Sequence, residues 1–221
     1  MTDDLEARGW ALIASNLAPE VLKALRENIF TPGVAGMRCL LDEPLVAAVA
    51  RELRGRLVEL GVLSAEAVAI QAIAFDKTPE TNWKVTWHQD VMFPFAQAVR
   101  SAGYDLATKK DGVDYARPPR AVLEQMLAVR LHLDDCDESN GPLRVSPGTH
   151  RGGVLRSTEI ADKVEQQGQV ICVARTGEAV LLRPLLLHAS SIAKEPRHRR
   201  VLHLVYHSGA PTVEHWHRAN H

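Results

Sequence analysis

The chain has 221 residues, of which 46% are hydrophobic and 24% charged, and its formal net charge is −1. This length and composition suit a globular protein with one sizeable core. The balanced charge gives no bulk attraction to nucleic acid or to anionic membranes, and no apolar run reaches the ~18 residues that a membrane span needs.

The first 65 residues predict helical support for a later core. The N-terminus, MTDDLEARGW, is acidic and unlike a secretory signal. In APEVLKALRENI, Pro19 suits a first helical turn. In DEPLVAAVARELRGRLVELG, we expect Asp42 to cap a second helix and Gly61 to end it.

From residue 66 to about residue 210 the pattern changes to short β-prone runs separated by turn residues. The runs are AVAIQAIAF, KVTWHQD, QMLAVRLHLDD, PLRVSP, QVICVA, EAVLLRP and RRVLHLVYH. Such runs without intervening helices predict an antiparallel sandwich or barrel. Residues 94–122 break this rhythm, and we interpret them as a long excursion that can act as a lid. No repeat or linker divides the chain, so residues 1–221 predict a single domain.

The phrase WHQD, at residues 87–90, ends one of the predicted strands. Side chains two apart on a strand share a face, so His88 and Asp90 can converge on one ion. Two ligands are weak evidence, because HxD also arises by chance as an ordinary strand end. A metal site would need a third ligand from another strand.

His188 is the best candidate for that third ligand. It ends the apolar run LLRPLLLH, where a buried imidazole needs a polar partner. A buried core histidine is the simpler interpretation of this residue taken alone. Two histidines and one carboxylate together, however, are typical of non-haem Fe(II) oxygenases, in which three metal positions stay open.

At this point the sequence resembles the phytanoyl-CoA dioxygenase family of Fe(II)/2-oxoglutarate oxygenases. The resemblance runs from LEARGWALIASNLAPEVLKALREN through FDKTPETNWKVTWHQD and MLAVRLHLDDCDESNGPLRVSPGTH to HASSIAKEPRHRRVLHLVYH. The family's HxD motif and distant histidine match His88, Asp90 and His188. Its cosubstrate arginine, eleven residues beyond that histidine, matches Arg199, and a nearby hydroxyl residue matches Ser190.

The resemblance implies a double-stranded β-helix core of the jelly-roll or cupin type, mostly β with N-terminal helices. It implies Fe(II) as cofactor, with 2-oxoglutarate and O2 as cosubstrates. The implied activity is a dioxygenase that hydroxylates a small molecule and releases succinate and CO2. Relatives that halogenate lack the carboxylate ligand, so Asp90 indicates hydroxylation or a related oxidation.

The residues themselves support a dicarboxylate cosubstrate. A guanidinium binds a carboxylate bidentately and stays charged, which favours Arg199 at the start of RRVLHLVYH for this task. Gln71, on the strand before WHQD, is a second candidate for contact with the cosubstrate, although a buried structural amide would look the same. The nearby Trp83 and Trp87 can line the pocket or belong to the core.

The chain has ten histidines, most of them after residue 187. His203 and His207 share a strand face with Arg199, so either can approach the site. His132 receives no assignment, and His150 is expected to be structural in its PGTH turn. His215 and His217 form an HxH pair that could bind a second metal, although a polar C-terminal tail is the simpler interpretation.

Two alternatives to an oxygenase stay open at this level. One is a non-catalytic cupin-like protein that binds a metal or ligand. The other is a zinc hydrolase, in which the same three residues would hold a catalytic water. Three cysteines without a CxxC pair favour the reducing cytoplasm. The sequence predicts a small-molecule substrate but neither its identity nor the oligomeric state.

Overall fold

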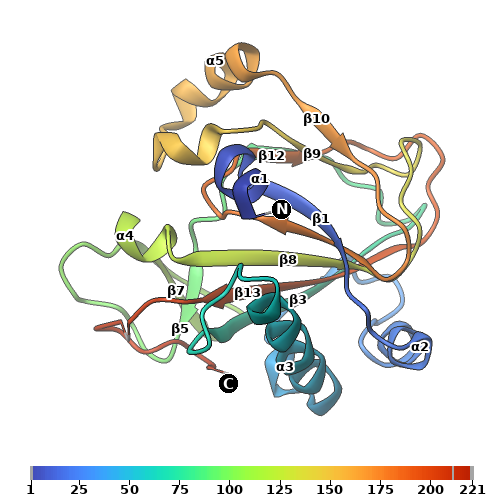
Figure 1. Ribbon diagram of the computed structural model, residues 1–221, viewed down its shortest axis with the longest axis horizontal. Coiled ribbons are helices and arrows are strands. Elements are labelled where there is room, and N and C mark those ends of the chain that lie inside the picture. The colour runs from blue at the N-terminus through green and yellow to red at the C-terminus, as the bar shows by residue number, and fades with distance from the viewer. Residues whose placement is uncertain (1, 211, 220–221) are drawn as a thin grey trace.

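The computed structural model describes residues 2–210 and 212–219, and its core is a pair of facing antiparallel sheets (Figure 1). The larger sheet has the strand order β1-β11-β8-β13-β3-β2 and the smaller one β10-β9-β12-β4. The larger sheet contains β1 (Trp10–Ala14), β2 (Gly36–Met37), β3 (Val68–Lys77), β8 (Met126–His132), β11 (Glu178–Leu182) and β13 (Arg199–His207). The smaller sheet contains β4 (Val85–His88), β9 (Leu143–Val145), β10 (Val170–Cys172) and β12 (His188–Ser190). The predicted antiparallel sandwich is confirmed.

Alternation along the strands of the larger sheet gives it two different faces. On β8, Val129 and Leu131 pack outward with the helices, whereas Ala128 packs inward against the smaller sheet. Helix α3 runs along the outer face, and α5 lies beyond the smaller sheet at the opposite end of the molecule (Figure 1). The helices are α1 (Thr2–Arg8), α2 (Pro19–Asn28), α3 (Pro44–Glu59), α4 (Arg120–Leu123) and α5 (Ser157–Gln167), with short 3-10 turns at Leu40–Asp42 and Thr149–Gly152.

The two predicted N-terminal helices are present, with one wrong capping residue. Glu43, not Asp42, is the residue before helix α3; Asp42 lies in the preceding 3-10 turn and pairs with Arg218. Its end is as expected: Gly61 follows the last turn with φ +70°, a conformation that glycine adopts without strain. Residues 1–65 are not only helical, because they also supply β1 and β2 to the larger sheet.

Residues 94–122 are more regular than predicted. Together with Phe93 they form the strands β5 (Phe93–Phe95), β6 (Asp105–Lys110) and β7 (Val113–Arg117), which make a three-stranded sheet, followed by α4. The sequence hid β6, because every residue of that strand is exposed and no apolar face marks it. Phe95 stacks on Trp216 at 4.8 Å between ring centroids, which packs this sheet against the C-terminal segment.

No helix in the described part of the chain combines the length and the apolar character needed to cross a bilayer.

Candidate metal and cosubstrate site

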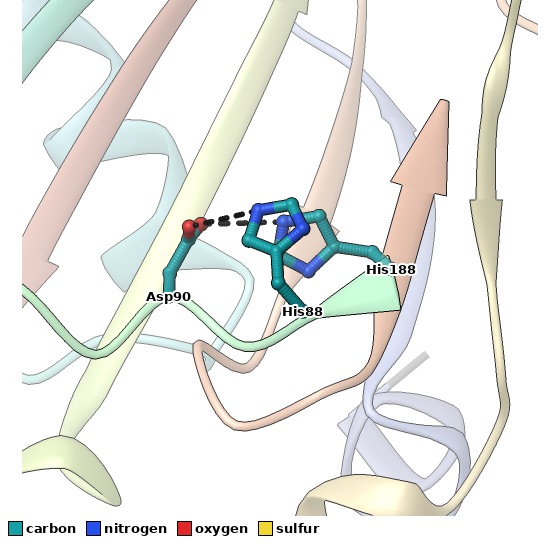
Figure 2. A group of neighbouring side chains, drawn as sticks. All are labelled: His88, Asp90 and His188. Carbon is teal, nitrogen blue, oxygen red and sulfur yellow. Dashed lines mark ion pairs between the residues drawn. The ribbon is translucent and has the colours of Figure 1, made fainter. Parts of the chain in front are cut away.

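The pairing of β4 with β12 brings the two candidate histidine ligands together. His88 and His188 are direct cross-strand partners in the antiparallel register, although they are far apart in the sequence. Opposite residues of such a pair have Cβ atoms only ~5 Å apart. The two ring centroids accordingly lie 4.2 Å from each other, and both rings point toward Asp90 (Figure 2).

Asp90 reaches the histidines from a loop. Strand β4 ends two residues earlier, so strand alternation, the predicted reason for its position, is not what places it. The loop is fixed by the side chain of Gln89, whose Nε2 donates to Gly153 O at 2.8 Å and to Leu185 O at 2.6 Å. Its Oε1 accepts from the backbone N–H of Leu155 at 2.8 Å. Gln89 therefore turns away from the site and holds the carboxylate in place, a role that the sequence did not reveal.

Backbone hydrogen bonds set the tautomer of both rings. Nδ1 of His88 lies 2.8 Å from Thr86 O, and Nδ1 of His188 lies 2.9 Å from Leu186 O. A carbonyl oxygen only accepts, so each Nδ1 carries the proton and each Nε2 presents a lone pair. These Nε2 atoms lie 3.6 and 3.5 Å from the two Asp90 carboxylate oxygens. Three ligand atoms within 4.8 Å of one another can hold one metal ion.

The electrostatics of this cluster also suit a cation. Burial raises the pKa of the Asp90 carboxyl, but His188 and His88 outweigh burial and hold that pKa well below its usual range. Burial lowers the pKa of His188 to about 4, so this ring is neutral at neutral pH. Burial also opposes the charge of His88, yet its hydrogen bond with Asp90 raises its pKa on balance. A bound metal would displace that proton, because histidine binds metals in its neutral form.

The three residues lie in a pocket of about 190 Å³ between the two sheets. Both sheets contribute to its wall, and so does the segment between β3 and β4. It is lined by Gln71, Ile73, Phe75, Trp83, Val85, His88, Asp90, Arg130, Leu143, His188, Ala189, Ser190, Arg199 and His203. All six residues predicted for the site line this one pocket.

Arg199 lines the pocket, and a second buried cation, Lys77, lies beside it outside the lining. Arg199 is 4% exposed and Lys77 is fully buried. Arg199 donates to Gly141 O and, at 3.3 Å, to Ser190 Oγ, while its Nε is buried without a partner. Lys77 donates to the same Ser190 Oγ at 3.2 Å and to Ser191 O at 2.6 Å. Among the described residues no carboxylate forms an ion pair with either cation, so an anionic group would complete the cluster.

The sequence interpretation missed Lys77. Arg199 and Lys77 are direct cross-strand partners on β13 and β3, which explains why the two cations meet. Alternation along β3 could have found the lysine, because it follows Gln71, Ile73 and Phe75 on one face. Burial, followed by the charge of Arg199, lowers the pKa of Lys77 to about 8.

The remaining polar and aromatic candidates divide between the pocket and other places. Gln71 lines the pocket, and its Oε1 is buried without a hydrogen-bond partner. Trp83 lines the pocket, whereas Trp87 stacks against an arginine outside it. His215 and His217 belong to no group of three potential metal ligands among residues 2–210 and 212–219.

The other histidines have different surroundings. His203 lines the pocket, and its Nε2 lies 3.9 Å from Asp90 Oδ2. His207, which shares the strand, lies outside the lining and packs near a tryptophan. His132 is buried with both ring nitrogens unpartnered. The Nε2 of His150 lies 3.1 Å from a backbone carbonyl of α1, which agrees with the structural role expected for its turn.

Residues 6–201 match the family model described as phytanoyl-CoA dioxygenase (PhyH). The chain belongs to the phytanoyl-CoA dioxygenase family. It is therefore an enzyme of the Fe(II)- and 2-oxoglutarate-dependent oxygenases, with O2 as the second cosubstrate. No curated protein sequence matches the chain.

Several solved structures share the fold of this chain at low sequence identity. EctD from S. alaskensis, with 2-oxoglutarate and 5-hydroxyectoine, has a TM-score of 0.68 at 16% identity, covering 94% of this chain and 74% of that one. HygX from Streptomyces hygroscopicus, with nickel and 2-oxoglutarate bound, has a TM-score of 0.64 at 16% identity, covering 98% and 94%. The α-ketoglutarate-dependent carbocyclase SnoK has a TM-score of 0.60 at 14% identity, covering 94% and 82%. The predicted jelly-roll core is confirmed.

The residues fit the metal and the cosubstrate that the family uses. Two imidazole Nε2 atoms and one carboxylate form the ligand set of a non-haem iron oxygenase. The unpartnered Nε of Arg199 and the adjacent Lys77 ammonium offer charge to a carboxylate.

Proposed function

We propose that His88, Asp90 and His188 hold Fe(II), and that Arg199 binds the far carboxylate of 2-oxoglutarate. We propose further that the enzyme hydroxylates a C–H bond of a small molecule and releases succinate and CO2. One observation carries this proposal: a single pocket is lined by the three potential metal ligands and by Arg199, and a second buried cation, Lys77, shares the Ser190 hydroxyl with Arg199.

Fe(II) with 2-oxoglutarate and O2 supplies the oxidising chemistry when bound, and the protein supplies geometry and charge. Three protein ligands leave room on the metal for the cosubstrate. Hydrogen bonds from Nδ1 of His88 and His188 to backbone carbonyls keep both Nε2 atoms aimed at one point. Gln89 holds the loop that carries the third ligand.

The far carboxylate would bind beside Arg199 and Lys77, next to the Ser190 hydroxyl that both cations contact. Both cations donate to Ser190 Oγ, so this hydroxyl keeps them at a fixed separation. Gln71 would offer its amide to the cosubstrate from the neighbouring strand β3. The zinc-hydrolase alternative gives no task to either buried cation.

The similar structures support a small-molecule substrate. HygX was crystallised with nickel and 2-oxoglutarate, and EctD with 2-oxoglutarate and 5-hydroxyectoine. We propose that residues 94–122 act as a lid over this substrate, although no residue of that segment is among the pocket lining described above. The lid would then have to move toward the pocket when substrate binds.

The proposed reaction is tested by incubating the enzyme with Fe(II), 2-oxoglutarate and a panel of small molecules, in air and under argon. We expect succinate to form only in air, together with a product that carries one added oxygen atom. The variant Asp90→Ala is the matched control and should form neither. Turnover that persists under argon, or without 2-oxoglutarate, would contradict the proposal and favour a hydrolase.

A further inference from the structure

Arg130 is a second arginine in the lining of the pocket, and the proposed reaction gives it no role. It lies on β8, directly opposite His203 of β13 in the antiparallel register. Both residues line the pocket. The inward face of β8 is otherwise apolar at Met126 and Ala128, so a guanidinium at this position needs a physical reason.

The guanidinium of Arg130 has few partners. Its Nε is buried without a hydrogen bond, and its Nη1 contacts only a neutral acceptor, Nδ1 of His203 at 3.5 Å. The group also lies over the Phe75 ring at 5.6 Å from the centroid. No carboxylate of the residues that the structure describes lies within 4.0 Å of it. Burial, and then the charge of Arg199, lower its pKa to about 10, so it stays charged at neutral pH.

Burying a guanidinium without an ion-pair partner costs stability, because the group loses its hydration. An anion that binds the buried cation offsets this cost. The charges of the proposed cosubstrate are already matched, because its far carboxylate has Arg199 and Lys77, and its near carboxylate has the metal. The charge of Asp90 acts on Arg130 and opposes the lowering of its pKa, but no carboxylate of the described residues forms an ion pair with Arg130.

The position of Arg130 relative to the metal ligands indicates what the missing anion belongs to. His203 stands between them, with Nδ1 toward Arg130 and Nε2 at 3.9 Å from Asp90 Oδ2. Only one imidazole ring therefore separates the guanidinium from the metal-binding carboxylate. An anion held by Arg130 would place the rest of a small molecule next to the metal.

We propose that Arg130 binds a carboxylate of the primary substrate, so that the enzyme oxidises a small carboxylic acid. The inference deepens the function proposed above and rests on it. The planar fork of arginine matches a carboxylate in two parallel hydrogen bonds, which favours this anion. Two other anions share the chemistry: phosphate, and the near carboxylate of 2-oxoglutarate itself.

The test uses anaerobic Fe(II) enzyme saturated with 2-oxoglutarate, titrated in a calorimeter with sodium acetate, acetamide or inorganic phosphate against matched sodium chloride. Acetate is small enough for a pocket of about 190 Å³. We expect acetate to bind one-to-one, acetamide not to bind, and Arg130→Met to weaken acetate at least tenfold. Arg130→Lys, which keeps the charge but loses the fork, should fall between wild type and Arg130→Met.

A second measurement separates the substrate from the cosubstrate. The affinity for 2-oxoglutarate, followed by the visible charge-transfer band of the Fe(II) complex, should change less than twofold in Arg130→Met. A loss as large as that for acetate would overturn the proposal and assign Arg130 to the cosubstrate. Equal acetate binding in wild type and Arg130→Met, no acetate binding in wild type, or preference for phosphate would also overturn it. Absence of the band in wild type would instead overturn the proposed function.

Thermal unfolding without ligands distinguishes binding from structural support. Removing an unpaired buried charge should leave the unfolding midpoint of Arg130→Met unchanged or raised. A midpoint lowered by several degrees would show that Arg130 supports the fold and would count against the proposal. Arg144→Met, on β9 and outside the pocket lining, is the matched control.

Discussion

Gln89 sits between two proposed metal ligands in the chain, and its side chain determines how they meet. Hydrogen bonds between its side-chain amide and the backbone of Gly153, Leu155 and Leu185 hold the loop that carries Asp90. Groups that orient metal ligands typically account for 10–100-fold in affinity. We expect Gln89→Ala to weaken Fe(II) binding by about tenfold or more.

The measurement for Gln89→Ala is a competitive metal titration of the apoprotein. Gln166→Ala, an exposed change on α5, is the matched control and should bind as wild type does. If Gln89→Ala bound the metal equally well, the loop would be held by other contacts, and the positioning role would be wrong.

Lys77 should make cosubstrate binding depend on pH. Its pKa of about 8 results from burial, then from Arg199, with Arg130 acting in the same direction and Cys136 in the opposite one. Below that pH the ammonium is charged and attracts a dianion; above it the amine is neutral. The Kd for 2-oxoglutarate should therefore rise between pH 7 and 9, by up to about tenfold per pH unit.

The control for this pH dependence is Lys77→Met. Its Kd for 2-oxoglutarate should be higher than that of wild type at pH 7 and nearly constant across the same range. The measurement is the titration of Fe(II) enzyme with 2-oxoglutarate at each pH. An identical rise in both proteins would assign the titration to another group.

At the scale of elements, the turn at Gly141 supports the cation cluster. Its carbonyl accepts from both Arg199 and Ser190, and its φ is +63°. A Cβ at this position would lie 2.8 Å from Ser191 O and 3.1 Å from Lys77 Nζ. Gly141→Ala should therefore destabilise the fold by about 1–2 kcal/mol from backbone strain and weaken 2-oxoglutarate binding through crowding.

Gly112 offers a control for the Gly141 prediction. It also has a positive φ, +81°, but a Cβ there would meet nothing within 4 Å. Chemical denaturation should show a smaller loss of stability for Gly112→Ala, and its 2-oxoglutarate affinity should be that of wild type. Equal cosubstrate affinity in both variants would contradict a role of the Gly141 turn in the cation cluster.

The elements also show what the sequence could predict and what it could not. Apolar runs and turn residues predicted the antiparallel strands, and motif spacing brought all six candidate residues to one pocket. Pairings over long sequence separations were hidden, since neither the His88–His188 register nor the Lys77–Arg199 register follows from local pattern. Strand β6 was missed because strands without a buried face carry no period-two signal.

For the whole molecule, we propose that residues 1–221 fold as one domain. The larger sheet contributes its outer face to a core with the helices and its inner face to a core with the smaller sheet. Because both cores include the larger sheet, unfolding that sheet would disrupt both of them. Calorimetry of the metal-free protein should therefore show one transition with equal calorimetric and van't Hoff enthalpies. Two resolved transitions would show that the cores unfold independently.

The central claim is that the pocket joins an iron site to a 2-oxoglutarate site. The most direct test is anaerobic titration of the protein with Fe(II), with and without 2-oxoglutarate, while the visible metal-to-ligand charge-transfer band is followed in wild type and Arg199→Ala. We expect a band in wild type that requires 2-oxoglutarate, and a variant that needs at least ~30-fold more cosubstrate, corresponding to about 2 kcal/mol for a lost charge-assisted pair. Iron bound without any band, or a band of unchanged affinity in Arg199→Ala, would contradict the claim.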